Sequence, residues 1–220
     1  MLRLENCLIE NGGFSLSADL EIARGSRIAV IGPSGAGKST LIEALAGFRQ
    51  LGNGAILWNN TDLAGVGPGK RPIAMLFQDG NLFPHLTVAQ NFGLGIHPNL
   101  RLDRLQQTQV QDALVRVGLD SMAGRKPAAL SGGQQSRVAL ARVLVQGRDL
   151  LLLDEPFAAL GPALKAEMLD LVSELVAETD ATLLMVSHDP SDARRIADQV
   201  VLVADGRAHA PQPTAQLLDN

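Results

Sequence analysis

A glycine-rich stretch between a predicted strand and a predicted helix constrains the fold more than any other feature of the sequence. It covers residues 32–40, with three glycines followed by Lys38 and a hydroxyl pair. The apolar run 27–31 before it predicts a short buried strand, and the spacing of apolar residues after it predicts a helix from Lys38 to about residue 47. Such glycines let backbone N–H groups close around phosphates, at a helix N-terminus that adds positive potential. The alternative is an ordinary glycine-rich turn.

The chemistry of this stretch assigns a role to each residue type. Lys38 is expected to reach the β- and γ-phosphates of a nucleotide, and the Ser39 hydroxyl to ligate Mg²⁺. The residues that we expect to hold the phosphates are Gly32, Pro33, Ser34, Gly35, Ala36, Gly37, Lys38, Ser39 and Thr40.

Composition narrows the class of protein. Of 220 residues, 46% are hydrophobic and 19% are charged, which is typical of a folded domain rather than a disordered chain. With 19 basic and 23 acidic residues the net charge is −4, and the chain has no Tyr and one Trp, so a nucleic-acid partner is not expected. The one cysteine, Cys7, can form no disulfide within the chain. Arg3, Glu5 and Glu10 interrupt any apolar stretch of a secretion signal.

Strand and helix patterns alternate along most of the chain. Strands are expected at 55–58, 73–77, 150–153, 182–186 and 200–203, and helices at 102–117, 138–145, 162–178 and 190–197. This alternation predicts an α/β fold with a mostly parallel sheet and a small β-rich layer at the N-terminus. The stretch from about 79 to 147 lacks strand signals, which predicts an inserted helical subdomain. We therefore expect one domain over 1–220, with its core from about 1–78 and 148–220.

Two acidic residues follow the apolar run 150–153. A buried strand would bring Asp154 beside the phosphates, where it can bind Mg²⁺ directly or through water. Glu155 is the next side chain, free to polarise an attacking water as a general base. The alternative is a strand end with two exposed acids.

A second small-residue motif, Ser131-Gly132-Gly133-Gln134, opens the helix predicted near 138–145. Bare backbone after a serine at a helix start can form a second anion site, although it can equally be an N-cap with a flexible turn. Gln78 and His188 each follow a predicted strand. An amide at the first position can touch a metal or water, and a neutral imidazole at the second can contact a γ-phosphate. Taken singly, each is more typical of a surface or capping residue.

The stretch 80–100 contains no Asp, Glu, Lys or Arg. Its asparagines, histidines and prolines make it too polar and too interrupted for a membrane-spanning helix. It is instead expected to face an apolar surface or another protein.

These motifs, in this order, resemble the ATP-binding subunits of ABC transporters over about residues 2–208. The resemblance implies a RecA-like P-loop NTPase core with an N-terminal antiparallel β layer, ATP as substrate and Mg²⁺ held by Ser39, Gln78 and Asp154. It implies hydrolysis by Glu155 with His188 as a sensor of the γ-phosphate. It also implies a head-to-tail dimer of two copies, in which Ser131, Gly132, Gly133 and Gln134 of one cover the γ-phosphate at Lys38 of the other.

The same resemblance implies further partners. A membrane permease would dock near Gln78 to Leu100, a periplasmic solute-binding protein would act indirectly, and the chain would be peripheral at the cytoplasmic face of the bacterial inner membrane. Segments 71–78, 81–88 and 91–95 are most similar to ATP-binding subunits of bacterial thiamine importers, which implies uptake of thiamine or its phosphate esters. The alternatives are an importer of another small solute, a soluble ABC ATPase that acts on nucleic acid or ribosomes, and a regulatory subunit without useful turnover. A nucleotide kinase is a less favoured alternative, because the motif at residues 130–135 would have no function in such an enzyme.

The sequence departs from the family pattern in three places. Ile9 and Glu10 stand where an aromatic residue that stacks on adenine is usual, and Phe14 is expected to come too late. The loop 158–161 reads Ala-Ala-Leu-Gly instead of Ser-Ala-Leu-Asp, so Gly161 replaces the acid that would contact the opposite copy. Ser136 stands where Gln or Arg is common.

Overall fold

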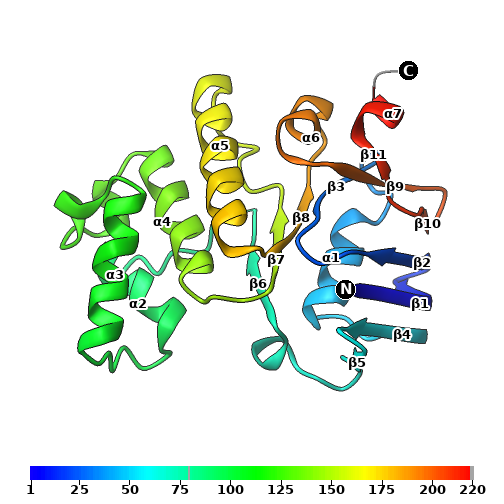
Figure 1. The fold of residues 1–220 in the computed structure, drawn as a ribbon, viewed down its shortest axis with the longest axis horizontal. Helices are drawn as coiled ribbons and strands as arrows, with labels where there is room; N and C mark the ends of the chain where they lie inside the picture. Colours follow the sequence, from blue (N-terminus) through cyan, green and yellow to red (C-terminus); the bar gives the residue numbers. More distant parts are fainter. Residues whose placement is uncertain (79, 219–220) are drawn as a thin grey trace.

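Parallel strands form the centre of the molecule (Figure 1). The computed structural model describes residues 1–78 and 80–218, so residue 79, where the helical subdomain is expected to begin, lies outside the described residues. The parallel strands have the order β9-β3-β8-β7-β6. They span Gln199–Ala204, Arg27–Ile31, Thr182–Val186, Leu150–Asp154 and Ile73–Leu76, respectively. Strand β8 is buried along its whole length, as the apolar run 183–186 that follows Thr182 predicts.

Antiparallel strands from the N-terminal part extend this sheet. They are β1 (Leu2–Asn11), β2 (Phe14–Ile22), β4 (Asn53–Trp58) and β5 (Thr61–Asp62), paired in the order β5-β4-β1-β2. Strand β2 alternates between buried and exposed residues, which is typical of an antiparallel strand with one solvated face. The short β10 (Arg207–Ala208) pairs with both β2 and β9 and joins the two parts, and β11 (Gln212–Pro213) pairs with β9.

Helices cover the sheet and form a separate lobe. Near the sheet lie α1 (Lys38–Ala46), α5 (Pro162–Thr179), α6 (Pro190–Ile196) and α7 (Thr214–Leu218), and the lobe consists of α2 (Val88–Ile96), α3 (Arg104–Arg116) and α4 (Gly132–Leu144) (Figure 1). Single 3₁₀ turns occupy Pro68–Lys70, Asp120–Met122 and Pro127–Ala129. Phe92, Leu114 and Val138 are buried together at the centre of the lobe. None of the helices in the described part of the chain has the length and hydropathy that a membrane crossing needs.

The predicted α/β fold with a mostly parallel sheet is confirmed; within the stretch predicted to be helical, the structure adds one helix and corrects the start of another. The stretch 80–100 contains a helix, α2, which begins at a capping box formed by Thr87 and Gln90. Helix α4 begins at Gly132 and not near residue 138, because the Ser131 side chain caps it. In both places a side-chain cap supplies acceptors and donors for backbone groups at the helix start, so the helix extends through residues of low helix propensity.

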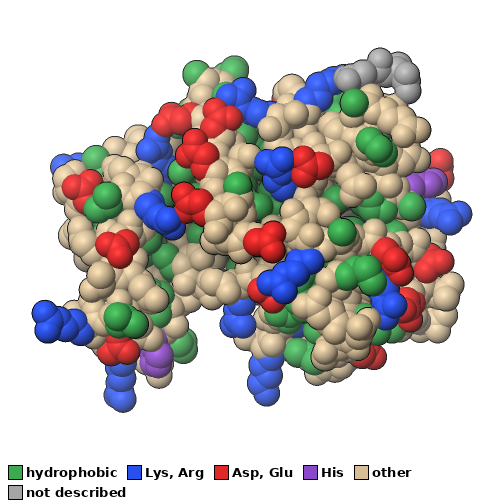
Figure 2. All heavy atoms as spheres, in the orientation of Figure 1, with side chains coloured by type: hydrophobic (Ala, Val, Ile, Leu, Met, Phe, Trp, Pro, Cys, Tyr) green, Lys and Arg blue, Asp and Glu red, His purple; other side chains and the backbone are tan. Residues whose placement is uncertain are grey.

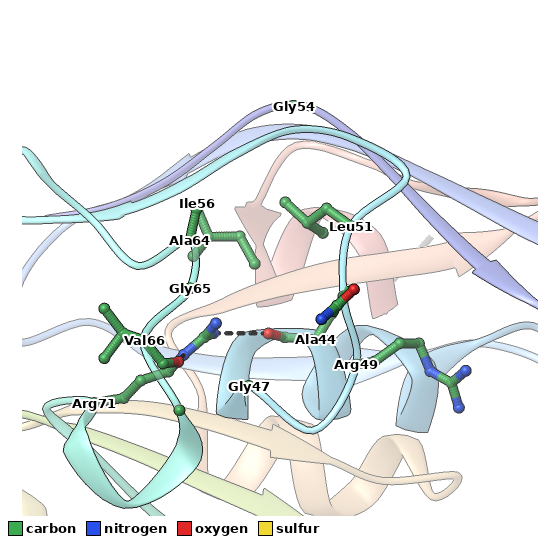
Figure 3. Close-up of a pocket in the computed structure, with 12 residues that line it drawn as sticks. Ala44, Gly47, Arg49, Leu51, Gly54, Ile56, Ala64, Gly65, Val66 and Arg71 are labelled. Atoms are coloured by element: carbon green, nitrogen blue, oxygen red, sulfur yellow. Dashed lines mark hydrogen bonds between the residues drawn. The ribbon is translucent and has the colours of Figure 1, made fainter.

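Arg71 fastens the segment before β6 to the end of α1. Its side chain is buried, and the guanidinium donates to the carbonyls of Leu63, Val66, Ala44 and Leu45 at 2.6–3.0 Å. Figure 3 shows Arg71 directed at the C-terminal end of α1 beside a hollow lined by Leu51, Gly54 and Val66. The cation therefore satisfies carbonyls of the last helical turn, where negative potential gathers.

We expect Arg71→Met to lower the free energy of unfolding by about 2–4 kcal/mol, because buried carbonyls that lose a donor cost about 1–3 kcal/mol each and the hollow admits water to some of them. Urea unfolding of the purified chain measures the loss. Arg101→Met, at an exposed arginine, serves as the control and should stay within about 0.5 kcal/mol of the wild type. Equal effects of the two substitutions would contradict the role given to Arg71.

Candidate active site

Two glycines give the phosphate loop its shape. Gly32 leaves β3 at a φ of 155°, and a Cβ there would lie 2.0 Å from the carbonyl oxygen of Val203 on β9. Gly37, at a φ of 102°, caps α1, and a Cβ there would lie 2.8 Å from Cε1 of Phe14. Neither position admits a side chain without rearrangement, so the loop path depends on both glycines. The ring of Phe14, which we expected to come too late to reach the nucleotide, therefore lies against the loop.

Lys38 spans the loop. Its side chain is buried, and Nζ donates to the carbonyl oxygens of Gly32 and Pro33 at 2.9 Å each. Ser34 and Gly35, at the tip, are exposed. The ammonium group is therefore held where the loop closes, next to backbone that solvent or a ligand can reach. A phosphate in the loop would offer this cation a charged partner in place of neutral carbonyls.

Ser39 and Asp154 lie together, although they are far apart in the sequence. The Ser39 hydroxyl donates to Oδ1 of Asp154 at 3.4 Å, where α1 begins and β7 ends. Burial raises the pKa of Asp154 above its ordinary value, and the hydrogen bond from Ser39 offsets part of that rise. A hydroxyl and a carboxylate are hard oxygen donors of the kind that Mg²⁺ takes along with phosphate oxygens and water. Within residues 1–78 and 80–218, no three His, Cys, Asp or Glu side chains gather as a metal cluster.

Glu155 and His188 also meet. Nδ1 of His188 lies 3.4 Å from Oε2 of Glu155, and the histidine side chain is 60% exposed while the glutamate is 25% exposed. Strands β7 and β8 are neighbours, and the Glu155 N–H donates to the carbonyl of Val186 at 3.2 Å. Glu155 has a φ of 46°, a left-handed conformation that costs a non-glycine residue energy and is often found at functional sites. The backbone at Glu155 is thus held at the end of β7, and its carboxylate lies beside an accessible imidazole.

The Ser131-Gly132-Gly133-Gln134 motif forms the start of α4. The Ser131 hydroxyl accepts from the Gln134 N–H at 3.3 Å, and the Gln134 side chain accepts from the Ser131 N–H at 2.9 Å. Serine therefore acts as an N-cap within this single chain. Gly133 is buried against α5, because a Cβ there would lie 2.5 Å from Leu164, whereas Gly132 is exposed with open space around it.

Gln78 is exposed after β6 and lines a groove between the lobe and the sheet. The groove is also lined by Gly132 and Ser136 of α4 and by Leu160 after β7. The structure thus brings Gln78 toward the start of α4, and it brings Ser39 toward Asp154 and Glu155 toward His188.

Two residues that the sequence analysis missed shape the loop after Gln78. Arg142 on α4 donates to the carbonyls of Asn81 and Gly80 at 2.7 and 2.9 Å, and its guanidinium lies 5.5 Å from the centre of the Phe83 ring. Asn91 is fully buried, and its amide bonds both the N–H and the carbonyl of Phe83. The sequence did hold a signal for Arg142. It is the one cation in the otherwise apolar stretch 138–145, where a charge that is removed from water needs partners.

Comparison with known proteins identifies the family. The model of the ABC transporter family matches residues 16–158. The chain belongs to the ABC transporter family. Among curated ABC proteins, the thiamine import ATP-binding protein ThiQ of Ruegeria sp. (strain TM1040) is 65% identical over 100% of this chain and 95% of its own length. ThiQ of Jannaschia sp. (strain CCS1) is 51% identical over 100% of this chain and 96% of its own length.

Solved ABC cassettes share the fold. A dimeric cassette in a post-hydrolysis state, bound to ADP and Pi, has a TM-score of 0.83 and 27% identity over 97% of this chain and 99% of its own. A second cassette in its ADP conformation has a TM-score of 0.90 and 25% identity over 100% of this chain and 95% of its own. The resemblance to ABC ATPases that the motifs indicated is thereby confirmed.

We expect Asp154→Asn to stabilise the chain at neutral pH in the absence of Mg²⁺ and nucleotide. Because burial raises the folded-state pKa of this carboxyl, its ionised form opposes folding, and stability is lost as pH rises through that pKa. The neutral amide removes this cost, so the melting temperature should rise, by about 2–4 °C for each 1 kcal/mol of relief in a chain of this size.

Thermal unfolding measured over a series of pH values tests this expectation. The advantage of Asp154→Asn should shrink as the pH falls toward the pKa of Asp154. A variant that is less stable than the wild type at neutral pH would contradict the stated effect of burial.

Proposed function

We propose that this chain is the ATP-hydrolysing subunit of a bacterial importer and that the imported solute is thiamine. The proposal that the solute is thiamine rests on the 65% identity, over the full chain, to a thiamine import ATP-binding protein. The chemistry is supported by the contacts between Ser39 and Asp154 and between Glu155 and His188. ABC membership supplies the reaction class.

In this proposal the phosphates of ATP lie in the loop 32–40. Lys38 exchanges the carbonyls of Gly32 and Pro33 for phosphate oxygens, and the start of α1 adds positive potential. Ser39 and Asp154, with Gln78, would hold Mg²⁺, which neutralises charge that develops on the phosphates. The pre-existing bond between Ser39 and Asp154 keeps both oxygens on the same side of the loop.

Glu155 acts as the general base. Its backbone is bonded to Val186, and its carboxylate lies 3.4 Å from Nδ1 of His188 and is partly screened from solvent, so it can accept a proton from the water that attacks the γ-phosphorus. His188, 3.4 Å from this carboxylate and more exposed, is suited to contact the γ-phosphate and to hold Glu155 in direction.

A second copy of the chain completes the site. Ser131, Gly132, Gly133 and Gln134 at the start of α4 would cover the γ-phosphate bound at Lys38 of the other copy. The exposure of Ser131 and Gly132 and the N-terminal potential of a 13-residue helix support this role. The dimeric cassette at 27% identity offers a precedent in the family.

A membrane permease is the proposed partner of the loop after Gln78. Phe83 is 44% exposed and Phe48 is 57% exposed, and Phe48 packs against Phe77 directly before Gln78. Figure 2 shows a notch between the helical lobe and the sheet at the lower edge of that view, with acidic and basic side chains interspersed over the face drawn. Phe83 lies in the uncharged segment 80–100, and an exposed ring on such a segment suits contact with a helix of a membrane subunit. In this arrangement the chain is peripheral at the inner face of the membrane, and a periplasmic binding protein delivers the solute.

Cross-complementation tests this function. In a Ruegeria strain without its own thiamine import ATP-binding protein, the wild-type chain should restore uptake of labelled thiamine. Glu155→Gln should bind ATP but lose at least about 100-fold in hydrolysis, because general bases contribute about 10²–10⁴-fold, and should not restore uptake.

Phe83→Ser separates docking from hydrolysis in the same strain. It should keep the ATP hydrolysis of the purified chain and lose uptake, because the ring is 44% exposed and contacts Arg142 and His85, not the residues proposed for hydrolysis. Uptake restored by Glu155→Gln would refute the catalytic assignment. ATP hydrolysis by the wild type without restored uptake of thiamine would refute the proposal that thiamine is the solute.

The sequence of the loop 158–161 predicts a weak dimer, because Gly161 replaces the acid that would contact the opposite copy. Gly161 has an extended backbone (φ −66°, ψ 158°) with open space where a Cβ would lie, and it caps α5 without a side-chain bond. Asp is a favoured N-cap residue, and an acid at this position is usual in the family. Gly161→Asp should therefore raise the dimer fraction of the Glu155→Gln chain in ATP, measured by sedimentation.

Gly124→Asp provides a matched control, because this glycine is also exposed with open space around it and gains the same charge. It should leave the dimer fraction unchanged. A dimer fraction after Gly161→Asp that equals or falls below that of the control would show that the loop reaches its partner through backbone and Leu160 alone.

A further inference from the structure

Lys165 links α5 to the loop that carries His188. Its Nζ lies 2.9 Å from Oδ2 of Asp189 and 2.7 Å from Oδ1 of Asp192. The Ser187 hydroxyl donates to Oδ2 of Asp192 at 2.5 Å and accepts from the Asp189 N–H at 3.1 Å. The residues on both sides of His188 therefore belong to one network that is centred on a single ammonium group.

The Lys165–Asp192 part of this network is largely shielded from water, whereas the side chain of Asp189 is 38% exposed. The side chains of Lys165 and Asp192 are 16% and 8% exposed, and Ser187 is buried. Glu155, Phe157, Lys165, Ser187, His188 and Asp192 line one small cavity. In such surroundings an ion pair is screened little, and the loss of one partner leaves a buried charge uncompensated.

Lys165 also lies one turn after the loop 158–161. Its backbone N–H donates to the carbonyl of Gly161 at 2.9 Å, which forms the first turn of α5. One residue is thus bonded through its backbone to the loop that follows Glu155, and through its side chain to the loop that carries His188. A displacement of either loop changes the position of Lys165.

We propose that Lys165 is a positioning residue for ATP hydrolysis, which holds His188 beside Glu155 and ties that geometry to the loop 158–161. The proposal rests on the proposed roles of Glu155 and His188. Lys165 itself is directed at Asp189 and Asp192 and acts through them, not on the nucleotide.

A second ion pair between the same two helices offers a matched control. Arg195 of α6 donates to both carboxylate oxygens of Asp170 on α5, at 2.7 and 2.6 Å, and both side chains are about half exposed. Its loss weakens the contact between α5 and α6 without touching the residues beside His188. If the role of Lys165 were purely structural, the loss of either ion pair would have the same effect on the rate of ATP hydrolysis.

The experiment compares Lys165→Met, Lys165→Arg and Arg195→Met in the full chain, with kcat and KM for Mg-ATP hydrolysis and the Kd for ATP. Lys165→Met should lower kcat at least about tenfold while KM and Kd stay within about twofold, since the loss falls on the transition state. Lys165→Arg should keep more than half of the wild-type kcat, and Arg195→Met should match the wild type.

Asp192→Asn is the second variant for the case in which Lys165→Met does not fold. It keeps the shape of the side chain and an acceptor for Ser187 while weakening the attraction to Lys165, and it should lower kcat with KM unchanged. Wild-type kcat in both variants, or equal losses in Lys165→Met and Arg195→Met, would overturn the proposal. A wild-type chain no more active than Glu155→Gln would instead refute the proposed hydrolysis itself.

Discussion

The parallel pairing of β3, β8, β7 and β6 is the constraint on which the site depends. Parallel strands end at one edge of a sheet, so the loops that leave their carboxyl ends meet there. The phosphate loop follows β3, Asp154 and Glu155 lie at the end of β7, and His188 follows β8. The contacts of Ser39 with Asp154 and of Glu155 with His188 arise because these strands lie within two places of one another. The pairing of these strands thus brings together residues that lie far apart in the sequence.

Sequence patterns predicted the parts of this arrangement whose chemistry is contiguous. The glycine-rich loop and the two acids after an apolar run are each visible within about ten residues, and the α/β alternation follows from a series of such local patterns. The helix α2 was missed because Gly93 and Gly95 lower its helix propensity, and burial of Phe92 in the lobe overrides that preference. The capping box of Thr87 and Gln90 was the local signal that could have revealed it.

Partners that are distant backbone groups could not be predicted in this way, even where the residue itself stands out in the sequence. Arg142 donates to carbonyls 61 and 62 residues earlier, and every residue carries a carbonyl, so no residue type marks the acceptor. Arg71 is the same case at the end of α1. For Ser131, the difficulty is that one side chain has two possible partners. Its cap and its proposed contact with a second copy use the same hydroxyl, and the chain alone displays the first. The division into a core and an inserted helical subdomain likewise stays a prediction.

The exposed rings beside Gln78 have a consequence for the chain when it is apart from a membrane. Phe48 and Phe83 are about half exposed, and the segment 80–100 offers no charge to repel a neighbouring molecule. A net charge of −4 over 220 residues gives weak long-range repulsion, which salt screens further. The solubility of the isolated chain therefore depends on these exposed aromatic rings. Self-association through the rings is favoured at high protein concentration, and also as the pH is lowered toward the isoelectric point of about 5.5, where the net charge vanishes.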